Sequence, residues 1–152
     1  MTKVEPLTPE EEILWRAMMR IVKVLPRCLD SDLIHGVGVS ASEYTAMMHL
    51  SEAPNRELRM SDLASATGLS ASRMTRLVDD LQSRSLVTKV ASASDARGNV
   101  ARLTSRGMSK LRGAWPVHLA SVRTRFFDHM DTSEIKPVAA ALSGVADHLE
   151  DG

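Results

Sequence analysis

Residues 60–104 decide the fold that this sequence predicts, and they read MSDLASATGLSASRMTRLVDDLQSRSLVTKVASASDARGNVARLT. The stretch holds a short helical pattern, a tight turn, a longer helical pattern and two strand-like patterns around a polar tip. These parts are residues 60–66, Gly68-Leu69, 70–84, 86–92 and 99–103, with the tip at 92–98. Two helices joined by a tight turn and followed by a β-hairpin are typical of a unit that reads nucleic acids.

The second helix of this stretch has one apolar face and one polar face. Gly68 can adopt a positive φ and redirect the chain, and Ser70 stands where an N-cap is expected. The apolar stripe is Met74, Leu77, Val78 and Leu81, at helical spacing. The candidate DNA contacts at its N-terminal end and on its polar face are Ser70, Ser72, Arg73, Thr75 and Arg76. An ordinary solvated helix face is the alternative interpretation.

The hairpin supplies three further candidate DNA contacts. Lys89 lies in the first strand, and Asp95 and Arg97 lie in the polar tip. An arginine at such a tip is suited to a minor groove, where the negative potential is concentrated, and Asp95 can brace the loop. The alternative is a surface turn with incidental charges. The pattern predicts a winged helix-turn-helix, mainly α with a small β-hairpin wing.

Two sets of residues resemble the MarR family of bacterial dimeric repressors. Asp95-x-Arg97 followed by Leu103-Thr104-x-x-Gly107 is similar to the wing signature of that family. The helix-turn-helix pattern is matched by Leu63-Ala64, Leu69-Ser70, Met74-Thr75, Leu77-Val78, Leu81 and Leu86-Val87. The resemblance covers nearly the whole chain. It implies a repressor, and a short third strand near Leu58-Arg59 that pairs with the hairpin.

The overall composition hides a charged footprint. The chain has 19 basic and 19 acidic residues and a formal net charge of +0. Residues 56–112, however, hold eleven Lys/Arg and five Asp/Glu, a net charge of +6 that the rest of the chain balances. A basic middle segment indicates contact with a polyanion such as double-stranded DNA.

Other classes of protein lack support in the sequence. We find no apolar run long enough to span a membrane and no signal-peptide pattern at the N-terminus, so we expect a cytoplasmic protein without a membrane partner. There is no phosphate-cradling loop, nucleophile elbow or tightly spaced metal motif. We therefore predict neither an enzyme nor a cofactor or metal site.

Long amphipathic helices flank the reading unit. A capping box at Thr8 starts a first helix that contains Pro26 and stops near Gly36, and Ser40 or Ser42 caps the second helix. A stripe from Met108 to Met130 predicts a helix of about 25 residues that Pro116 should bend, and a final helix follows. We divide the chain into an N-terminal dimerisation helix, a DNA-binding domain and C-terminal dimerisation helices, at residues 1–35, 40–104 and 105–150.

The flanking stripes predict a twofold homodimer that meets a pseudo-palindromic operator. The alternative is a helical cap that folds back on its own chain. Family resemblance also implies a crevice for a small aromatic or phenolic acid that releases DNA. The candidate ligand residues are Trp15, Arg16, Arg20, Tyr44, Met48 and His118. For each of these residues, a place in the core or on the solvated surface is the alternative.

Two other functions stay open at this stage. The positive face of a winged helix can dock an acidic protein instead of DNA. Cys28, the single cysteine, allows a redox-responsive regulator, although it lies near the far end of the first helix.

Overall fold

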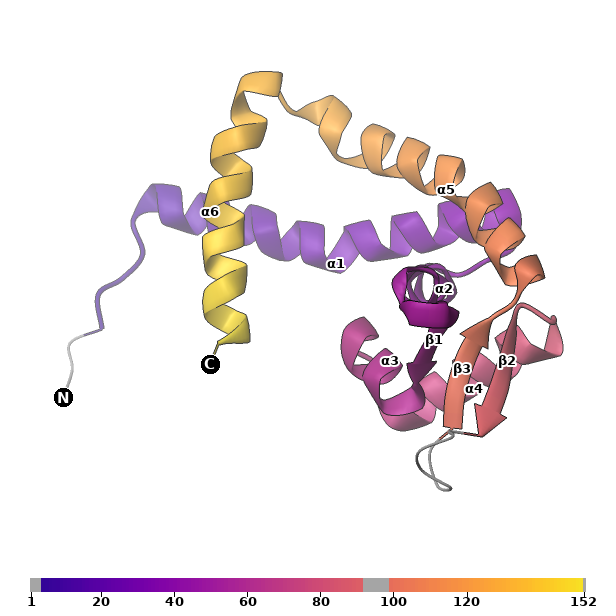
Figure 1. Cartoon of the computed structure of the whole chain (residues 1–152). Helices are drawn as coiled ribbons and strands as arrows, with labels where there is room; N and C mark the ends of the chain where they lie inside the picture. The colour runs from indigo at the N-terminus through magenta and orange to yellow at the C-terminus, as the bar shows by residue number, and fades with distance from the viewer. Residues whose placement is uncertain (1–3, 92–98, 152) are drawn as a thin grey trace. The chain divides into compact units, whose positions relative to one another are not determined.

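The computed structural model describes residues 4–91 and 99–151 (Figure 1). Two compact units make up the chain, Met1–His118 and Leu119–Gly152. Its elements are α1 (Pro9–Val37), α2 (Ala41–Glu52), η1 (Pro54–Arg56), β1 (Glu57–Arg59), α3 (Met60–Thr67), α4 (Ala71–Ser83), β2 (Val87–Ala91), β3 (Asn99–Leu103), α5 (Ser105–Arg125), η2 (Phe127–His129) and α6 (Thr132–Glu150). The predicted fold class, mainly α with a small β wing, is confirmed.

Local capping signals set the ends of the first two helices. The Thr8 hydroxyl accepts from the Glu11 amide and the Glu11 carboxylate accepts from the Thr8 amide, so the predicted capping box is present. Ser40 forms the same box with Glu43, which decides between the two predicted caps of α2. Helix α1 ends at Gly38, whose φ of 66° is left-handed.

Pro26 neither divides nor ends α1. The helix continues on both sides of it for a total of 29 residues. A proline removes one amide donor from the ladder, and the hydrogen bonds of the neighbouring turns preserve the helix. The sequence had left a kink or a division open at this position, and the structure excludes the division.

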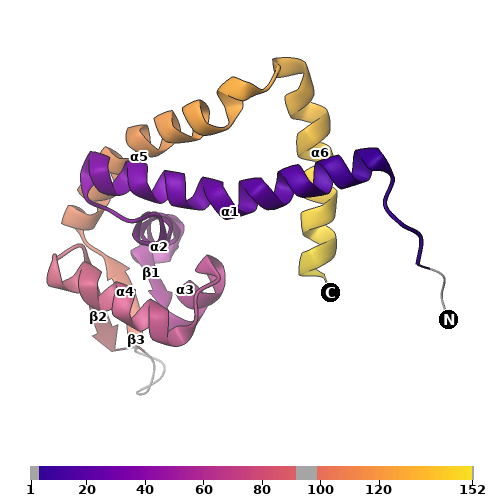
Figure 2. The same cartoon turned by 180° about the vertical axis from the view of Figure 1, so that it is seen from behind.

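The helix-turn-helix and its wing form as predicted. Gly68 ends α3 with a φ of 67°, and the Ser70 hydroxyl accepts from the Arg73 amide at the start of α4. The three strands form an antiparallel sheet in the order β1-β3-β2, which confirms the short third strand. Helix α4 packs on one face of this sheet, behind it in Figure 1 and in front of it in Figure 2.

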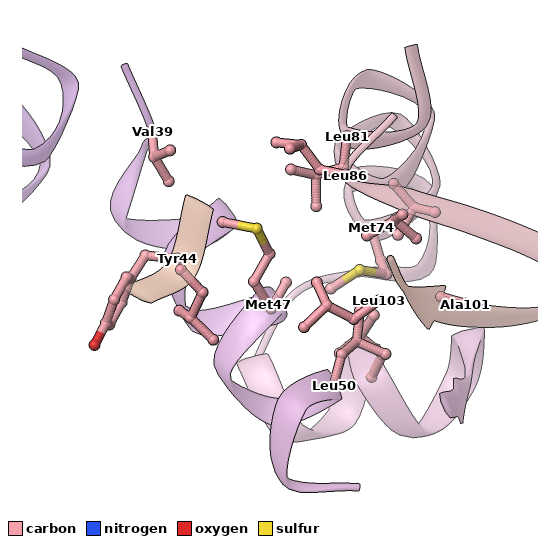
Figure 3. Close-up of a cluster of buried hydrophobic side chains, with 14 of the residues drawn as sticks. Val39, Tyr44, Met47, Leu50, Met74, Leu81, Leu86, Ala101 and Leu103 are labelled. Carbon is pink, nitrogen blue, oxygen red and sulfur yellow. The ribbon is translucent and has the colours of Figure 1, made fainter. Parts of the chain in front are cut away.

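A core of aliphatic side chains and methionine joins these elements (Figure 3). Met47 and Leu50 of α2 are completely buried, as are Met74 and Leu81 of α4. Leu33 is the one residue of α1 that is buried. Most of α1 therefore lies outside the core of its unit.

The start of α5 is fastened to the beginning of β2. The Thr104 hydroxyl lies 2.8 Å from the Ser85 carbonyl oxygen and 3.0 Å from that of Leu86, and it accepts from the Gly107 amide at 2.9 Å. A Cβ added at Gly107 would lie 2.1 Å from the Leu86 carbonyl oxygen. Position 107 therefore requires glycine, because any side chain would force α5 away from the sheet.

Helix α5 is shorter than predicted. It has 21 residues and ends at Arg125, where the stripe had predicted a helix to Met130. Phe126 leaves the helical region with φ of −132° and ψ of −65°, and it meets Phe127 edge to face at 5.2 Å. Periodicity alone misses this end, because Phe126 and Met130 stay in register with the stripe although they flank the 3₁₀ turn η2. Asp131 and Glu134 then form the capping box of α6.

Within the first unit, Tyr44 of α2 packs against His118 of α5. Their ring centroids are 4.6 Å apart, and Trp115 lies 6.5 Å from the same imidazole. Nδ1 of His118 is buried and has no hydrogen-bond partner. Burial lowers the pKa of His118 below its ordinary value, because desolvation penalises the charged imidazolium.

The lowered pKa of His118 predicts that the folded chain loses stability in mild acid. The unfolded chain binds a proton at His118 near pH 6.5, where the folded chain still keeps the ring neutral. The stabilising contribution is therefore complete above about pH 6.5 and declines as the pH falls towards the lowered pKa, by at most about 1.4 kcal/mol per pH unit. Urea unfolding at pH 7.5 and 5.5 should show a smaller difference for His118→Gln than for the wild type. His148→Gln, at an exposed site in α6, is the control, and an unchanged pH dependence in His118→Gln would contradict the prediction.

Candidate nucleic-acid interface

Helix α4 separates a buried stripe from a cationic face. Met74 and Val78 have no exposed surface, whereas Arg73 and Arg76 are exposed. Neither arginine forms an ion pair with an acidic side chain in the part of the chain that the structure describes. Two uncompensated guanidinium groups on a rigid helix are therefore available to an external anion.

The hydroxyl groups on α4 divide between structural and available roles. The Ser70 hydroxyl caps the helix, and it lies 3.4 Å from the Ser72 hydroxyl. The Thr75 hydroxyl donates to the Ala71 carbonyl oxygen at 2.9 Å, which leaves its lone pairs free to accept. Ser70, Ser72 and Thr75 are all exposed, so a polar ligand can reach this end of the helix.

Lys89 is engaged by a partner that the sequence analysis missed. Its ammonium forms an ion pair with Asp79, which joins β2 to α4. Arg102 of β3 pairs in the same way with Glu57, its register partner in β1. These two cations brace the wing against its neighbours, whereas Arg73 and Arg76 of α4 have no such partner among the described residues. Lys89 and Asp79 are ten residues apart and lie on different elements, so no helical or strand periodicity in the sequence indicates that they pair.

A second network missed by the sequence analysis holds the C-terminal end of α4. The Arg84 Nη1 lies 3.3 Å from a Glu43 carboxylate oxygen and 3.4 Å from one of Asp80. Burial raises the pKa of Glu43, Asp80 adds to that shift, and Arg84 opposes it. The network ties α4 to the start of α2 and so helps to fix the direction of the reading helix.

Two of the predicted DNA contacts, Asp95 and Arg97, lie outside the described residues. Strands β2 and β3 flank these residues, and Ala91 and Asn99 are the last register pair before them. The proposed contact of Arg97 with the minor groove stays a prediction.

The structure brings only some of the predicted ligand residues together. Tyr44 and His118 are in contact, and Met48 is half-buried on the same helix as Tyr44. A Cβ on Gly36 would lie 2.8 Å from Val117, the neighbour of His118, so this ring pair lies near the C-terminal end of α1.

The α1 candidates lie elsewhere in the same chain. Trp15 precedes Gly36 by 21 residues and Arg20 precedes it by 16, or about 31 Å and 24 Å along a helix. Trp15 is 52% exposed, and Arg16 pairs with Glu12 at 2.6 Å. A single chain therefore does not bring the whole predicted ligand set together.

Other kinds of site receive no support from the described ranges, 4–91 and 99–151. Within them, no group of three or more His, Cys, Asp or Glu residues could hold a metal ion. No helix there has the length and apolar character needed to cross a membrane. Cys28 is a free, half-buried thiol in α1.

Comparison with known proteins agrees with this geometry. A family model described as MarR family matches residues 37–98. No curated protein sequence matches the chain. The structure is similar to that of Sco3205, a MarR family transcriptional regulator from Streptomyces coelicolor solved in complex with DNA, with 31% identity and a TM-score of 0.87 over 98% of this chain and 93% of that one.

Two further solved structures share the fold. AbsC, a MarR family transcriptional regulator from Streptomyces coelicolor, has 32% identity and a TM-score of 0.86 over 98% of this chain and 100% of its own. CouR from Rhodococcus jostii RHA1, solved with p-coumaroyl-CoA, has 21% identity and a TM-score of 0.70 over 86% of this chain and 89% of its own, a likeness of fold. The identity of about one third over nearly the whole chain, together with the winged helix-turn-helix, shows that this chain belongs to the MarR family of transcriptional regulators.

Proposed function

We propose that the protein is a dimeric, sequence-specific DNA-binding repressor that acts in the cytoplasm on a pseudo-palindromic operator and is released by a small aromatic or phenolic acid. The observation that carries the DNA-binding part is the exposed pair Arg73 and Arg76, held on a helix whose other face buries Met74, Val78 and Leu81. A rigid helix with open guanidinium groups near its start suits the major groove, where arginine recognises guanine.

The distribution of charge supports the same partner. The net charge of +6 over residues 56–112 favours a polyanion, and Arg97 is proposed to reach the adjacent minor groove. The relative Sco3205, at 31% identity, was solved in complex with DNA. In this proposal Ser70, Ser72 and Thr75 contact phosphates or bases, and Lys89 and Asp95 brace the wing.

Unburied apolar side chains support the homodimer. On the N-terminal two thirds of α1 these are Ile13, Leu14, Trp15, Met19, Ile21, Val22 and Val24, each at least 42% exposed. Helix α6 has no buried residue and exposes Leu142, Val145 and Leu149. Apolar faces of this extent on long helices are stabilised by a partner, and a twofold copy would also duplicate α4 for two half-sites.

The proposed effector site combines an aromatic wall with cations. Tyr44, Met48 and His118 would contact the ring of the acid, and Arg16 or Arg20 would bind its carboxylate. The α1 residues are too far along the helix to join from the same chain, so the second copy would supply them. CouR, which shares the fold, was solved with p-coumaroyl-CoA, a phenolic acyl thioester.

DNA recognition is tested with alanine variants of the reading helix. Arg73→Ala and Arg76→Ala should each weaken binding to a duplex selected from a randomised pool by roughly tenfold or more, and should relax the base preference at one position. Fluorescence anisotropy at several salt concentrations measures both affinity and salt dependence. Arg123→Ala, on the exposed surface of α5, should bind as the wild type does. Wild-type affinity in both reading-helix variants would refute the assignment.

Dimerisation is tested by placing a charge on the apolar face of α6. Leu142→Glu should shift the mass in light scattering from that of a dimer towards the 16.6 kDa of one chain, because a buried carboxylate costs several kcal/mol. Ser143→Glu adds the same charge at the next, exposed position and should leave the dimer intact. A wild-type protein that is monomeric at every concentration would contradict the dimer.

Release by the effector is tested on the preformed DNA complex. With 4-hydroxybenzoate as the probe, the wild-type complex should dissociate, whereas Arg20→Ala should bind the duplex normally and respond at least about tenfold more weakly. Lys23→Ala, an exposed cation on the same helix, is the matched control. A response that survives in both Arg16→Ala and Arg20→Ala would remove α1 from the effector site.

A further inference from the structure

An open pocket lies on the first unit at the end of α4 that is farther from Arg73 and Arg76. It has a volume of about 470 Å³ and is lined by Gly38, Arg84, Leu86, Arg106, Ser109 and Lys110. The lining comes from the connection between α1 and α2, from the step between α4 and β2, and from the start of α5. Figure 1 shows these segments meeting at one corner of the unit, where α5 begins, and the same meeting is visible from behind in Figure 2.

Two of the cations in this pocket are uncompensated. Arg106 and Lys110 are four residues apart on α5, so they lie on one face of the helix, and like charges at this spacing disfavour each other. Neither forms an ion pair with a described acidic residue. Lys110 is also half-buried, which makes an unpaired ammonium there less favourable still.

Arg84, the third cation of the pocket, already has two acidic partners. Glu43 and Asp80 hold the Arg84 guanidinium at 3.3 and 3.4 Å and so fix its position in the pocket wall. The charge that remains without compensation is therefore about +2, carried by Arg106 and Lys110. A ligand with a charge near −2 matches it.

The rest of the lining provides space and an apolar surface. An added Cβ at Gly38 would meet nothing within 4 Å, so this wall is open. Leu86 contributes an apolar part of the lining, and Ser109 adds a hydroxyl beside the cations. The volume falls in the range of pockets that bind small molecules and exceeds the needs of a single ion.

We propose that this pocket binds the phosphate group of a small phosphate monoester, with Arg106, Lys110 and Ser109 as its ligands and Arg84 as an ordered cationic wall. A phosphate monoester carries about −1.5 to −2 charge at neutral pH and offers three acceptor oxygens, whereas a carboxylate carries −1 and offers two. Leu86 and the space beside Gly38 take the esterified part of the molecule.

The position of the pocket argues against a role in binding the DNA backbone. It lies at the C-terminal end of α4, which spans 13 residues, about 20 Å from the end that carries Ser70 and Arg73. It also lies by Leu86 before β2, whereas the hairpin tip follows Ala91, five strand residues or about 17 Å farther on. The proposed DNA contacts and the pocket are therefore at opposite ends of the same elements.

The test measures binding to the full-length protein without DNA, so its outcome does not depend on the proposed function. Isothermal titration with phenyl phosphate should show binding by the wild type and affinity at least about tenfold weaker for Arg106→Gln and for Lys110→Gln. Arg112→Gln removes a cation from another face of α5, outside the pocket, and should leave the affinity unchanged. Circular dichroism of each variant verifies that the fold is kept, and Arg106→Gln changes only an exposed side chain.

Three further outcomes would overturn the proposal. If benzoate bound as tightly as phenyl phosphate, the pocket would have no preference for phosphate over carboxylate. If inorganic phosphate bound as tightly as phenyl phosphate, the esterified group would make no contribution to binding. Absence of phenyl phosphate binding, with duplex affinity reduced in Arg106→Gln and Lys110→Gln, would assign the two cations to the DNA backbone instead.

Discussion

The contact between Thr104, Gly107 and the Leu86 carbonyl is the constraint on which the arrangement of the first unit depends. One hydroxyl caps the start of α5 and also bonds to the chain just before β2. The absence of a side chain at Gly107 lets the helix backbone approach that carbonyl. Since β2 is held to α4 by the Lys89–Asp79 ion pair, the direction of α5 is tied through the sheet to the reading helix.

The distribution of ion pairs explains how a chain with no net charge can leave unpaired cations on one exposed helix face. Lys89, Arg84 and Arg102 each have acidic partners that lie on a neighbouring element, so these cations join elements together. Arg73 and Arg76 have no such partner among the described residues, and they lie on an exposed helix face. The acidic residues of the winged unit thus determine which of its basic residues remain open to a ligand.

Sequence reasoning succeeded at several places where the deciding interaction is local. The capping box at Thr8, the left-handed turn at Gly68 and the apolar stripe of α4 each depend on residues within a few positions of one another, and the same kind of local signal left Ser40 and Ser42 as the two possible caps of α2. It failed at the end of α5, where Phe126 keeps the periodicity while its backbone leaves the helix. It could not reveal the Arg84–Glu43 pair, which joins residues 41 positions apart. Sequence reasoning also could not give the separation of Trp15 and Arg20 from Tyr44 within one chain, because a list of residue types contains no distances.

The separation of these two groups of candidate residues along the chain has a physical consequence for any effector of this protein. Along a straight helix, Trp15 and Arg20 lie about 31 Å and 24 Å from Gly36, whose added Cβ would meet Val117, the neighbour of His118, and no rotamer of either side chain covers such a distance. In the proposed dimer, a second copy of the chain would complete a site that uses both groups. Binding of the acid and association of the apolar helix faces would then be linked equilibria, because a ligand that contacts both protomers stabilises the dimer in which it binds. The same ligand would act on DNA through the spacing of the two reading helices, without touching Arg73 or Arg76.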